Sequence, residues 1–295
     1  MRPSRHPRPL ILWLPFLLLA FAGGCARQPP GENGSQTALS GKRIRVTLTF
    51  AAPINPNYYY YFIMNVSNAS LANGDKNAPG PIPVGAPVSG QPYGNGFATG
   101  STAGTGGFTD FVLFNDPFQY PGSQARQGFG LYHVVDSSTC SPSCANDRRN
   151  FVAEGAPITF VRPSTDPTDP ASTRIQFEID LAQLIPNAAT QLQAVNEALL
   201  LQYIQVNVIA TNVVPTDTQT SIPKLFDSFG DTRDGRGNFL ILDVSKADTI
   251  SNGDIRTINT SEPTDIDDVY ISPPGSANQD PALNLKDWRI DIVQQ

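Results

Sequence analysis

Residues 43–50 read Arg-Ile-Arg-Val-Thr-Leu-Thr-Phe, an unbroken alternation of polar and apolar side chains. A period of two residues predicts a β-strand with one buried face. Residues 173–180 and 286–293 repeat this pattern. The side chains that we expect to point inward from these three strands are Ile44, Val46, Leu48 and Phe50, then Ile175, Phe177 and Ile179, then Trp288, Ile290 and Ile292.

Six further segments have the composition of strands: 57–66, 108–114, 129–135, 157–162, 201–209 and 239–244. The first of them, Asn57-Tyr-Tyr-Tyr-Tyr-Phe-Ile-Met-Asn-Val66, is apolar on both faces, which is typical of a central strand.

One helix is predicted over residues 188–200, with an apolar face at Leu192, Val195 and Leu199. A single helical turn is expected over residues 181–184, with Asp180 as its N-cap. About nine strands, one short helix and no repeated βαβ spacing predict a mainly β protein. The expected architecture is a two-sheet antiparallel β-sandwich with one short helix and long Gly/Pro-rich loops.

The composition excludes several classes of protein. The 295 residues are 40% hydrophobic, which is enough to build a core. The formal net charge of −6 argues against a nucleic-acid partner.

The first residues have the pattern of a secretory signal. Arg2, Arg5 and Arg8 precede an apolar run over residues 10–22, and small residues follow it. A single transmembrane anchor is the alternative, but the run is too short to span a bilayer comfortably. Residues 1–24 are therefore predicted to be a signal peptide.

Ala22-Gly-Gly-Cys25 resembles the lipobox of bacterial lipoproteins. The resemblance implies that Cys25 becomes the new N-terminus and carries a diacylglyceryl group and an N-acyl chain such as palmitate. It implies a lipid-anchored protein of the bacterial cell envelope, and Ala26 after the cysteine favours the outer membrane or cell surface. Residues 25–41 would then be the lipidated N-terminus and a flexible tether, and residues 42–295 a single β-sandwich domain.

The other two cysteines, Cys140 and Cys144, lie in a turn-rich segment. In an oxidising compartment they predict a small-loop disulfide bond. The alternative is a metal or redox pair. After removal of the signal, the one remaining histidine is His133, which excludes His-rich metal catalysis. A Ser-His-Asp triad would have to use His133, although a hydrogen-bonded histidine on a sheet is the more common explanation.

Residues 71–107 contain ten Gly and five Pro, and loops of this length are usually functional or disordered. Candidate ligand-binding residues are Tyr59, Tyr61 and Tyr93, because exposed rings serve as stacking platforms for sugars. The alternative is that both faces of residues 58–66 are packed. Candidate ligands for a structural calcium are Asp231, Asp234, Asp265 and Asp267, with ordinary turn formation as the alternative.

Residues 173–184, 203–212 and 227–231 resemble parts of DOMON-like and family-9-carbohydrate-binding-like β-sandwich modules. The chain also resembles uncharacterised bacterial surface lipoproteins. The first resemblance implies a non-catalytic binding module for a glycan or small molecule, with haem ligation by Met64 and His133 as a variant. Two other hypotheses stay open at this point: a structural or assembly lipoprotein that contacts another envelope protein, and a glycosidase that uses two Asp.

Overall fold

The computed structural model describes residues 40–66, 109–115, 128–134, 151–185, 190–212, 226–229, 239–256 and 280–294. All of them belong to one compact unit, Gly34–Gln295. Residues 1–39, and with them the predicted signal peptide and Cys25, lie outside the described residues.

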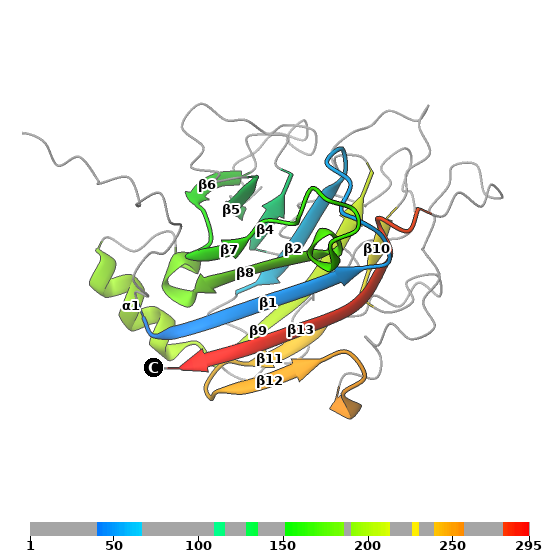
Figure 1. Cartoon of the computed structure of the whole chain (residues 1–295). Helices are drawn as coiled ribbons and strands as arrows, with labels where there is room; N and C mark the ends of the chain where they lie inside the picture. Colours follow the sequence, from blue (N-terminus) through cyan, green and yellow to red (C-terminus); the bar gives the residue numbers. More distant parts are fainter. Residues whose placement is uncertain are drawn as a thin grey trace, which may run out of the picture. The chain divides into compact units, whose positions relative to one another are not determined.

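The described strands form two antiparallel sheets, so the predicted β-sandwich is confirmed (Figure 1). The five-stranded sheet has the order β12-β13-β1-β8-β7. Its strands are β12 (Asp248–Ser251), β13 (Leu285–Gln294), β1 (Lys42–Phe50), β8 (Arg174–Asp180) and β7 (Thr159–Val161). The alternating strands β1, β8 and β13 are neighbours in its centre, as expected of long strands that each have one buried face.

The seven-stranded sheet has the order β10-β9-β2-β4-β5-β6, and β11 also pairs with β9. Its strands are β10 (Phe226–Ser228), β9 (Tyr203–Thr211), β2 (Tyr59–Asn65), β4 (Asp110–Phe114), β5 (Phe129–Val134), β6 (Phe151–Gly155) and β11 (Leu240–Asp243). Strand β2 lies between β4 and β9, which confirms its predicted central position.

The core lies between the two sheets. Every side chain that the alternation placed inward on β1, β8 and β13 is at most 3% exposed and belongs to this core. Trp288 packs against Phe229 with ring centroids 5.0 Å apart. The seven-stranded sheet contributes Tyr60, Phe62 and Met64 from β2.

The helix α1 (Gln191–Leu200) lies within the predicted range, with Thr190 as N-cap. Of its predicted apolar face, Val195 packs against the core, but Leu192 and Leu199 do not. Leu192 is 69% exposed and Leu199 is 48% exposed, whereas Ala194 and Ala198 are buried. The helix contacts the 3₁₀ helix η5 (Leu181–Leu184). Because alanine has the smallest side chain that favours a helix, the alanine face allows the close approach and the leucines point away.

The effect of a substitution on α1 on the free energy of unfolding is expected to depend on which face the residue occupies and not on its hydrophobicity. Leu192→Ser and Leu199→Ser should change the free energy of unfolding by less than about 0.5 kcal/mol, since both side chains are exposed. Ala198→Leu should cost about 1–3 kcal/mol, because a larger side chain overpacks the buried face. Denaturant unfolding of the three variants measures this, and a large loss for either serine variant would contradict the observed face.

Residue 40, just before β1, is held next to η5 by one buried side chain. The carboxylate of Asp180, which is fully buried, caps η5 through the Ala182 amide at 2.9 Å. It also accepts hydrogen bonds from the Ser40 amide at 2.9 and 3.1 Å and from the Ser40 hydroxyl at 2.7 Å. The predicted N-cap is therefore confirmed, and the same side chain holds residue 40 in place.

Candidate functional site

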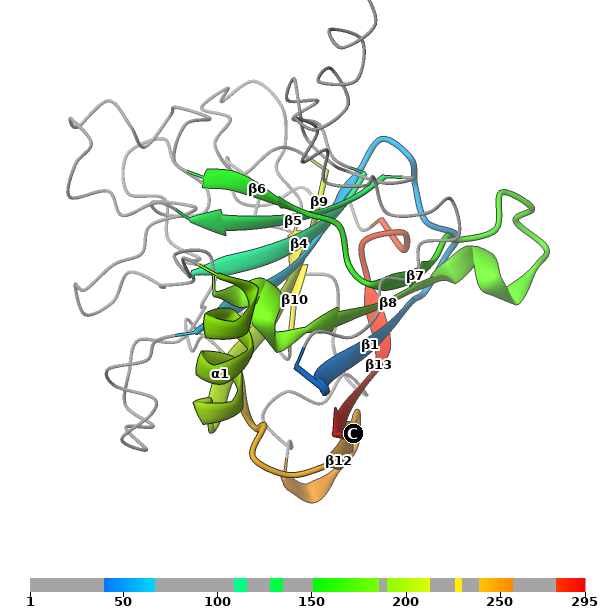
Figure 2. The ribbon, with the colours of Figure 1, turned by 90° about the vertical axis from the view of Figure 1, so that its left-hand side faces the viewer.

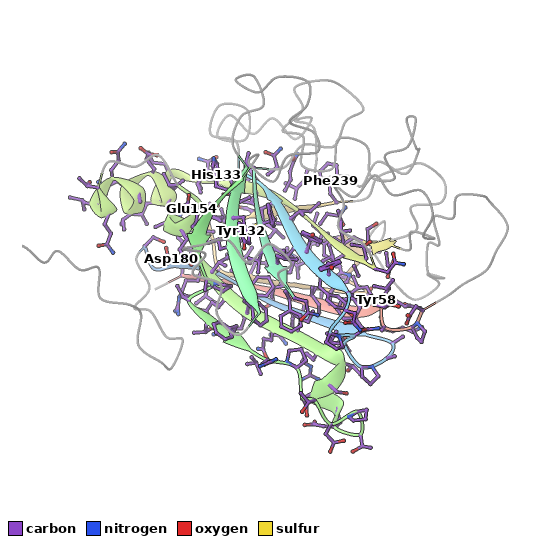
Figure 3. The ribbon with its side chains drawn as sticks, turned by 90° about the horizontal axis from the view of Figure 1, so that it is seen from above. Tyr58, Tyr132, His133, Glu154, Asp180 and Phe239 are labelled. Atoms are coloured by element: carbon purple, nitrogen blue, oxygen red, sulfur yellow. The ribbon has the colours of Figure 1, made fainter. Side chains whose placement is uncertain are left out.

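Three side chains from neighbouring strands share one row on the inner face of the seven-stranded sheet. Met64 of β2 pairs with Asp110 of β4, and Asp110 pairs with His133 of β5. Directly opposed residues in an antiparallel sheet project to the same face. The row stands near the end of the sheet that lies toward α1, where Figure 3 labels His133 and Glu154.

A chain of hydrogen bonds runs through this row. The Val66 amide donates to the Thr109 hydroxyl at 2.8 Å, and that hydroxyl donates to Oδ2 of Asp110 at 2.6 Å. Oδ1 of Asp110 lies 3.0 Å from Nδ1 of His133. Val66 and Thr109 flank residues 67–108, which include the predicted functional loop. Asp110 therefore links the two residues that flank this segment to the imidazole.

Asp110 and His133 each affect the pKa of the other. Complete burial raises the pKa of Asp110, and the hydrogen bonds from His133 and Thr109 offset only part of that rise. Burial by itself would lower the pKa of His133, but the hydrogen bond and charge of Asp110, with the charge of Glu154, outweigh it and raise the pKa. The net effect on His133 is that its carboxylate neighbours favour the protonated imidazole.

Glu154, whose charge raises the pKa of His133, lies at a bulge in β6. Leu131 pairs with Gly155 while Tyr132 pairs with Ala153, so Glu154 is an extra residue opposite that step. Gly155 follows with φ of 121°, in the region that favours glycine. Bulges re-aim side chains and are enriched next to functional sites.

His133 is the accessible member of the group. Its side chain is 21% exposed, whereas that of Asp110 is 1% exposed. Within the described residues, His133 makes one side-chain hydrogen bond, through Nδ1 to Asp110. Nε2 can therefore donate a hydrogen bond to a ligand. In the same part of the chain no Ser, Thr or Cys side chain is hydrogen-bonded to Nε2, and the Thr109 hydroxyl is engaged by Asp110.

Of the three tyrosines predicted to bind a ligand, two are described. Tyr59 is partly buried, but Tyr61 is 1% exposed. The ring of Tyr61 packs against Phe111 at 5.8 Å, and Phe111 stacks on Tyr132 at 5.0 Å. From Tyr60 to Asn65 the side chains of β2 are buried on both faces, so the packed alternative is the one observed here. Tyr93 lies outside the described residues.

The remaining predicted site residues also lie outside the described residues: Cys140, Cys144, Asp231, Asp234, Asp265 and Asp267. Of the proposed haem ligands, Met64 is fully buried in the core and His133 lies two strands away, with Asp110 between them. No group of three or more His, Cys, Asp or Glu side chains that could hold a metal ion occurs among the described residues.

The other buried carboxylates serve the fold. Glu178 is paired with Arg43 at 2.7 Å and with Arg45 at 3.0 Å. Asp227 accepts hydrogen bonds from the Ser228 amide and, at 2.6 Å, from the Leu285 amide. Together with Asp180 these are the buried carboxylates in the described part of the chain besides Asp110, and each is occupied by backbone amides or arginines. None is arranged as a free acid–base pair for glycoside cleavage.

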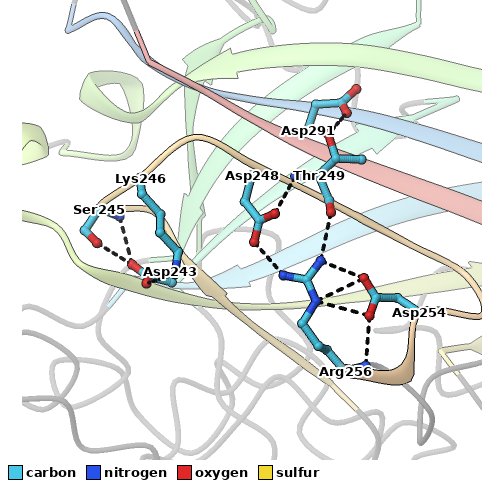
Figure 4. Close-up of polar contacts among 8 residues, drawn as sticks. All are labelled: Asp243, Ser245, Lys246, Asp248, Thr249, Asp254, Arg256 and Asp291. Carbon is cyan, nitrogen blue, oxygen red and sulfur yellow. Dashed lines mark hydrogen bonds and ion pairs between the residues drawn. The ribbon is translucent and has the colours of Figure 1, made fainter.

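A second polar cluster, at β12, is also structural (Figure 4). Arg256 bridges Asp254 and Asp248 and donates to the Thr249 carbonyl oxygen. Its hydrogen bonds lower the pKa of Asp254. The exposed ion pairs close the turn after β12 and leave no unpaired charge that points to a ligand.

None of the helices in the described ranges is both long and apolar enough to span a bilayer. Comparison with known protein families, with curated proteins and with solved structures found no match. The Asp110–His133 pair, with Thr109 and Glu154, is therefore identified from geometry alone. Sequence reasoning had singled out His133 but not its partner.

Proposed function

We propose that this chain is a lipid-anchored protein of the bacterial cell envelope whose β-sandwich is a non-catalytic binding module for a glycan or another small polar molecule. The proposed ligand site is the end of the seven-stranded sheet that carries Asp110 and His133. The lipobox-like sequence at Cys25 supports the anchor.

One observation carries the binding site: a half-buried imidazole is held by the same hydrogen-bonded chain that joins the two ends of residues 67–108. Long segments fixed at their base by a rigid scaffold are the common location of ligand recognition. A side chain locked by a buried carboxylate is already oriented for binding. A hydroxyl or carboxylate of the ligand would accept from Nε2 of His133.

A thermal-shift screen of glycans and small polar molecules with the mature chain Cys25–Gln295 tests the proposal. We expect saturable binding that weakens about tenfold in His133→Gln, because one hydrogen bond to a charged group is worth about 1.5 kcal/mol. Tyr58→Phe is the matched control. Tyr58 donates to Asp280, and Figure 3 shows it at the far end of the sandwich from His133.

The control variant should bind like the wild type, and the bound ligand should be recovered unchanged. A screen without any hit, or hits that ignore His133, would reject the proposed site. Chemical conversion of a hit would reject the non-catalytic assignment.

A further inference from the structure

The exposed side of α1 is an apolar surface formed by Leu192, Leu199 and Leu200, which we call the leucine face. These side chains are 69, 48 and 75% exposed. Leu192 and Leu199 are seven residues apart and so lie on one side of the helix, opposite the buried alanines. Apolar side chains that gather on one side of an element are typical of an interaction surface.

The helix carries little charge that would oppose contact with an apolar environment. Glu197 is the one ionisable residue among Gln191–Leu200, and its carboxylate accepts a hydrogen bond from the Gln193 side chain at 2.8 Å. Covering the leucine face therefore removes little hydration from charged groups of the helix itself.

The chain enters the folded domain beside this face. The ammonium group of Lys42 donates to the carbonyl oxygens of Leu199 at 2.7 Å and Leu201 at 3.1 Å. Asp180 holds Ser40, and η5 contacts α1. Figure 2 shows α1 at the end of the sheets where β1 begins. Residue 40, to which residues 25–39 are attached, is thus held beside η5, which contacts α1.

The length of the preceding segment limits what can cover this face. For a segment of fifteen residues, the length of 25–39, the random-coil relation gives an end-to-end distance of about 20 Å. Leu39 is its one large aliphatic side chain, so this segment cannot cover three leucines. A bilayer that holds acyl chains on Cys25 would lie within reach.

We propose that the leucine face docks on the lipid bilayer in which Cys25 is anchored. This inference rests on the proposed lipid anchor. Docking at α1 orients the domain, because α1 leads into β9 at the end of the sheet that carries Asp110 and His133. The candidate site then lies toward the membrane.

Fluorescence in brominated vesicles tests the docking. The full-length chain is expressed with its own signal in bacteria and reconstituted into phosphatidylethanolamine–phosphatidylglycerol vesicles with brominated acyl chains. Leu199→Trp places a probe on the leucine face, and Val161→Trp is the control. Val161 is 56% exposed and pairs with Gln176 near the start of β8, away from η5.

The wild-type emission spectrum is first subtracted from that of Leu199→Trp. We expect the remaining tryptophan emission to shift to the blue and to be quenched by about half by the bromine atoms of the bilayer. Val161→Trp should show neither effect. The matched variant Leu192→Ser/Leu199→Trp should be quenched less, with unchanged stability.

Flotation of the same vesicles separates the two proposals. If the protein floats with the vesicles but both tryptophan variants are quenched equally, the proposed lipid anchor stands and the docking is overturned. Protein that does not float and carries no acyl mass on Cys25 overturns both. The emission of Leu199→Trp could also shift to the blue without vesicles, by an amount that grows with protein concentration. That result would mean that the leucine face binds a second copy of the chain, and it would also overturn the docking.

Discussion

Asp180→Ala is expected to lower the free energy of unfolding by about 3 kcal/mol, because it leaves buried amides without an acceptor. The wild-type carboxylate accepts from the Ser40 amide, the Ser40 hydroxyl and the Ala182 amide. Its loss removes the cap of η5 and the contact that fixes the beginning of the domain. Chemical denaturation of the mature chain measures the effect.

Asp169→Ala is the matched control for this substitution. Asp169 caps a second four-residue 3₁₀ helix, η4 (Pro170–Thr173), through the Ala171 amide at 2.8 Å, but it is exposed and holds no distant segment. Its replacement should cost only about 1 kcal/mol, as for an ordinary cap. Equal losses in the two variants would show that the contact with Ser40 contributes nothing.

Asp180→Ala should also weaken the docking of α1 indirectly. If Ser40 is released, the anchored segment no longer enters the domain at a fixed point beside the leucine face. The tryptophan placed at Leu199 would then be quenched less in Asp180→Ala than in the parent variant, although the protein still floats with the vesicles.

The long strands could be predicted because each has one buried face and an uninterrupted period of two. The alternation of β1, β8 and β13 identified both the strands and the side chains that fill the core. The strands that were missed are Phe151–Gly155, Phe226–Ser228 and Asp248–Ser251. They lie at sheet edges and are short, so pairing with a neighbour and not their own pattern determines them.

The helix α1 shows what a local sequence pattern cannot predict. Its sequence has a leucine stripe, and amphipathic patterns normally place such a stripe against the core. Here the buried side chains of α1 are Ala194 and Ala198, and the leucines point away from the core. A local pattern identifies two chemically distinct faces but does not say which one a neighbour covers.

The candidate site was visible in the sequence only in part. Asp110 and His133 each interrupt an otherwise apolar strand, and the two strands are consecutive segments of the described chain. An ionisable residue in each of two such strands is a signal that they pair, since an isolated buried charge is costly. The register that aligns them, and the bulge at Glu154, depend on tertiary structure.

The Asp110–His133 pair should give the protein a pH-dependent stability. The pKa of His133 is raised in the folded state, so the folded protein binds this proton more tightly than the unfolded chain. The stabilisation is fully present below the ordinary histidine pKa of about 6.5 and is lost as pH rises through the higher folded value. The raised pKa of Asp110 acts in the same direction at lower pH.

We therefore expect the free energy of unfolding to fall as the pH rises above about 6.5, and Asp110→Asn to abolish this slope. Without the carboxylate, burial of the imidazole again acts to lower its pKa, against the remaining charge of Glu154. Urea unfolding at several pH values measures the slope. Glu197→Gln, on the exposed side of α1, is the control and should keep it.

Proton NMR can assign this slope to one group, because the sequence has one histidine besides His133, namely His6, which the proposed removal of residues 1–24 would delete. Its imidazole signal should titrate with a pKa above 6.5 in the wild type and at a lower value in Asp110→Asn. A wild-type pKa at or below 6.5 would mean that burial outweighs Asp110. The pair would then be a neutral hydrogen bond, and the slope of stability with pH would have to come from other groups.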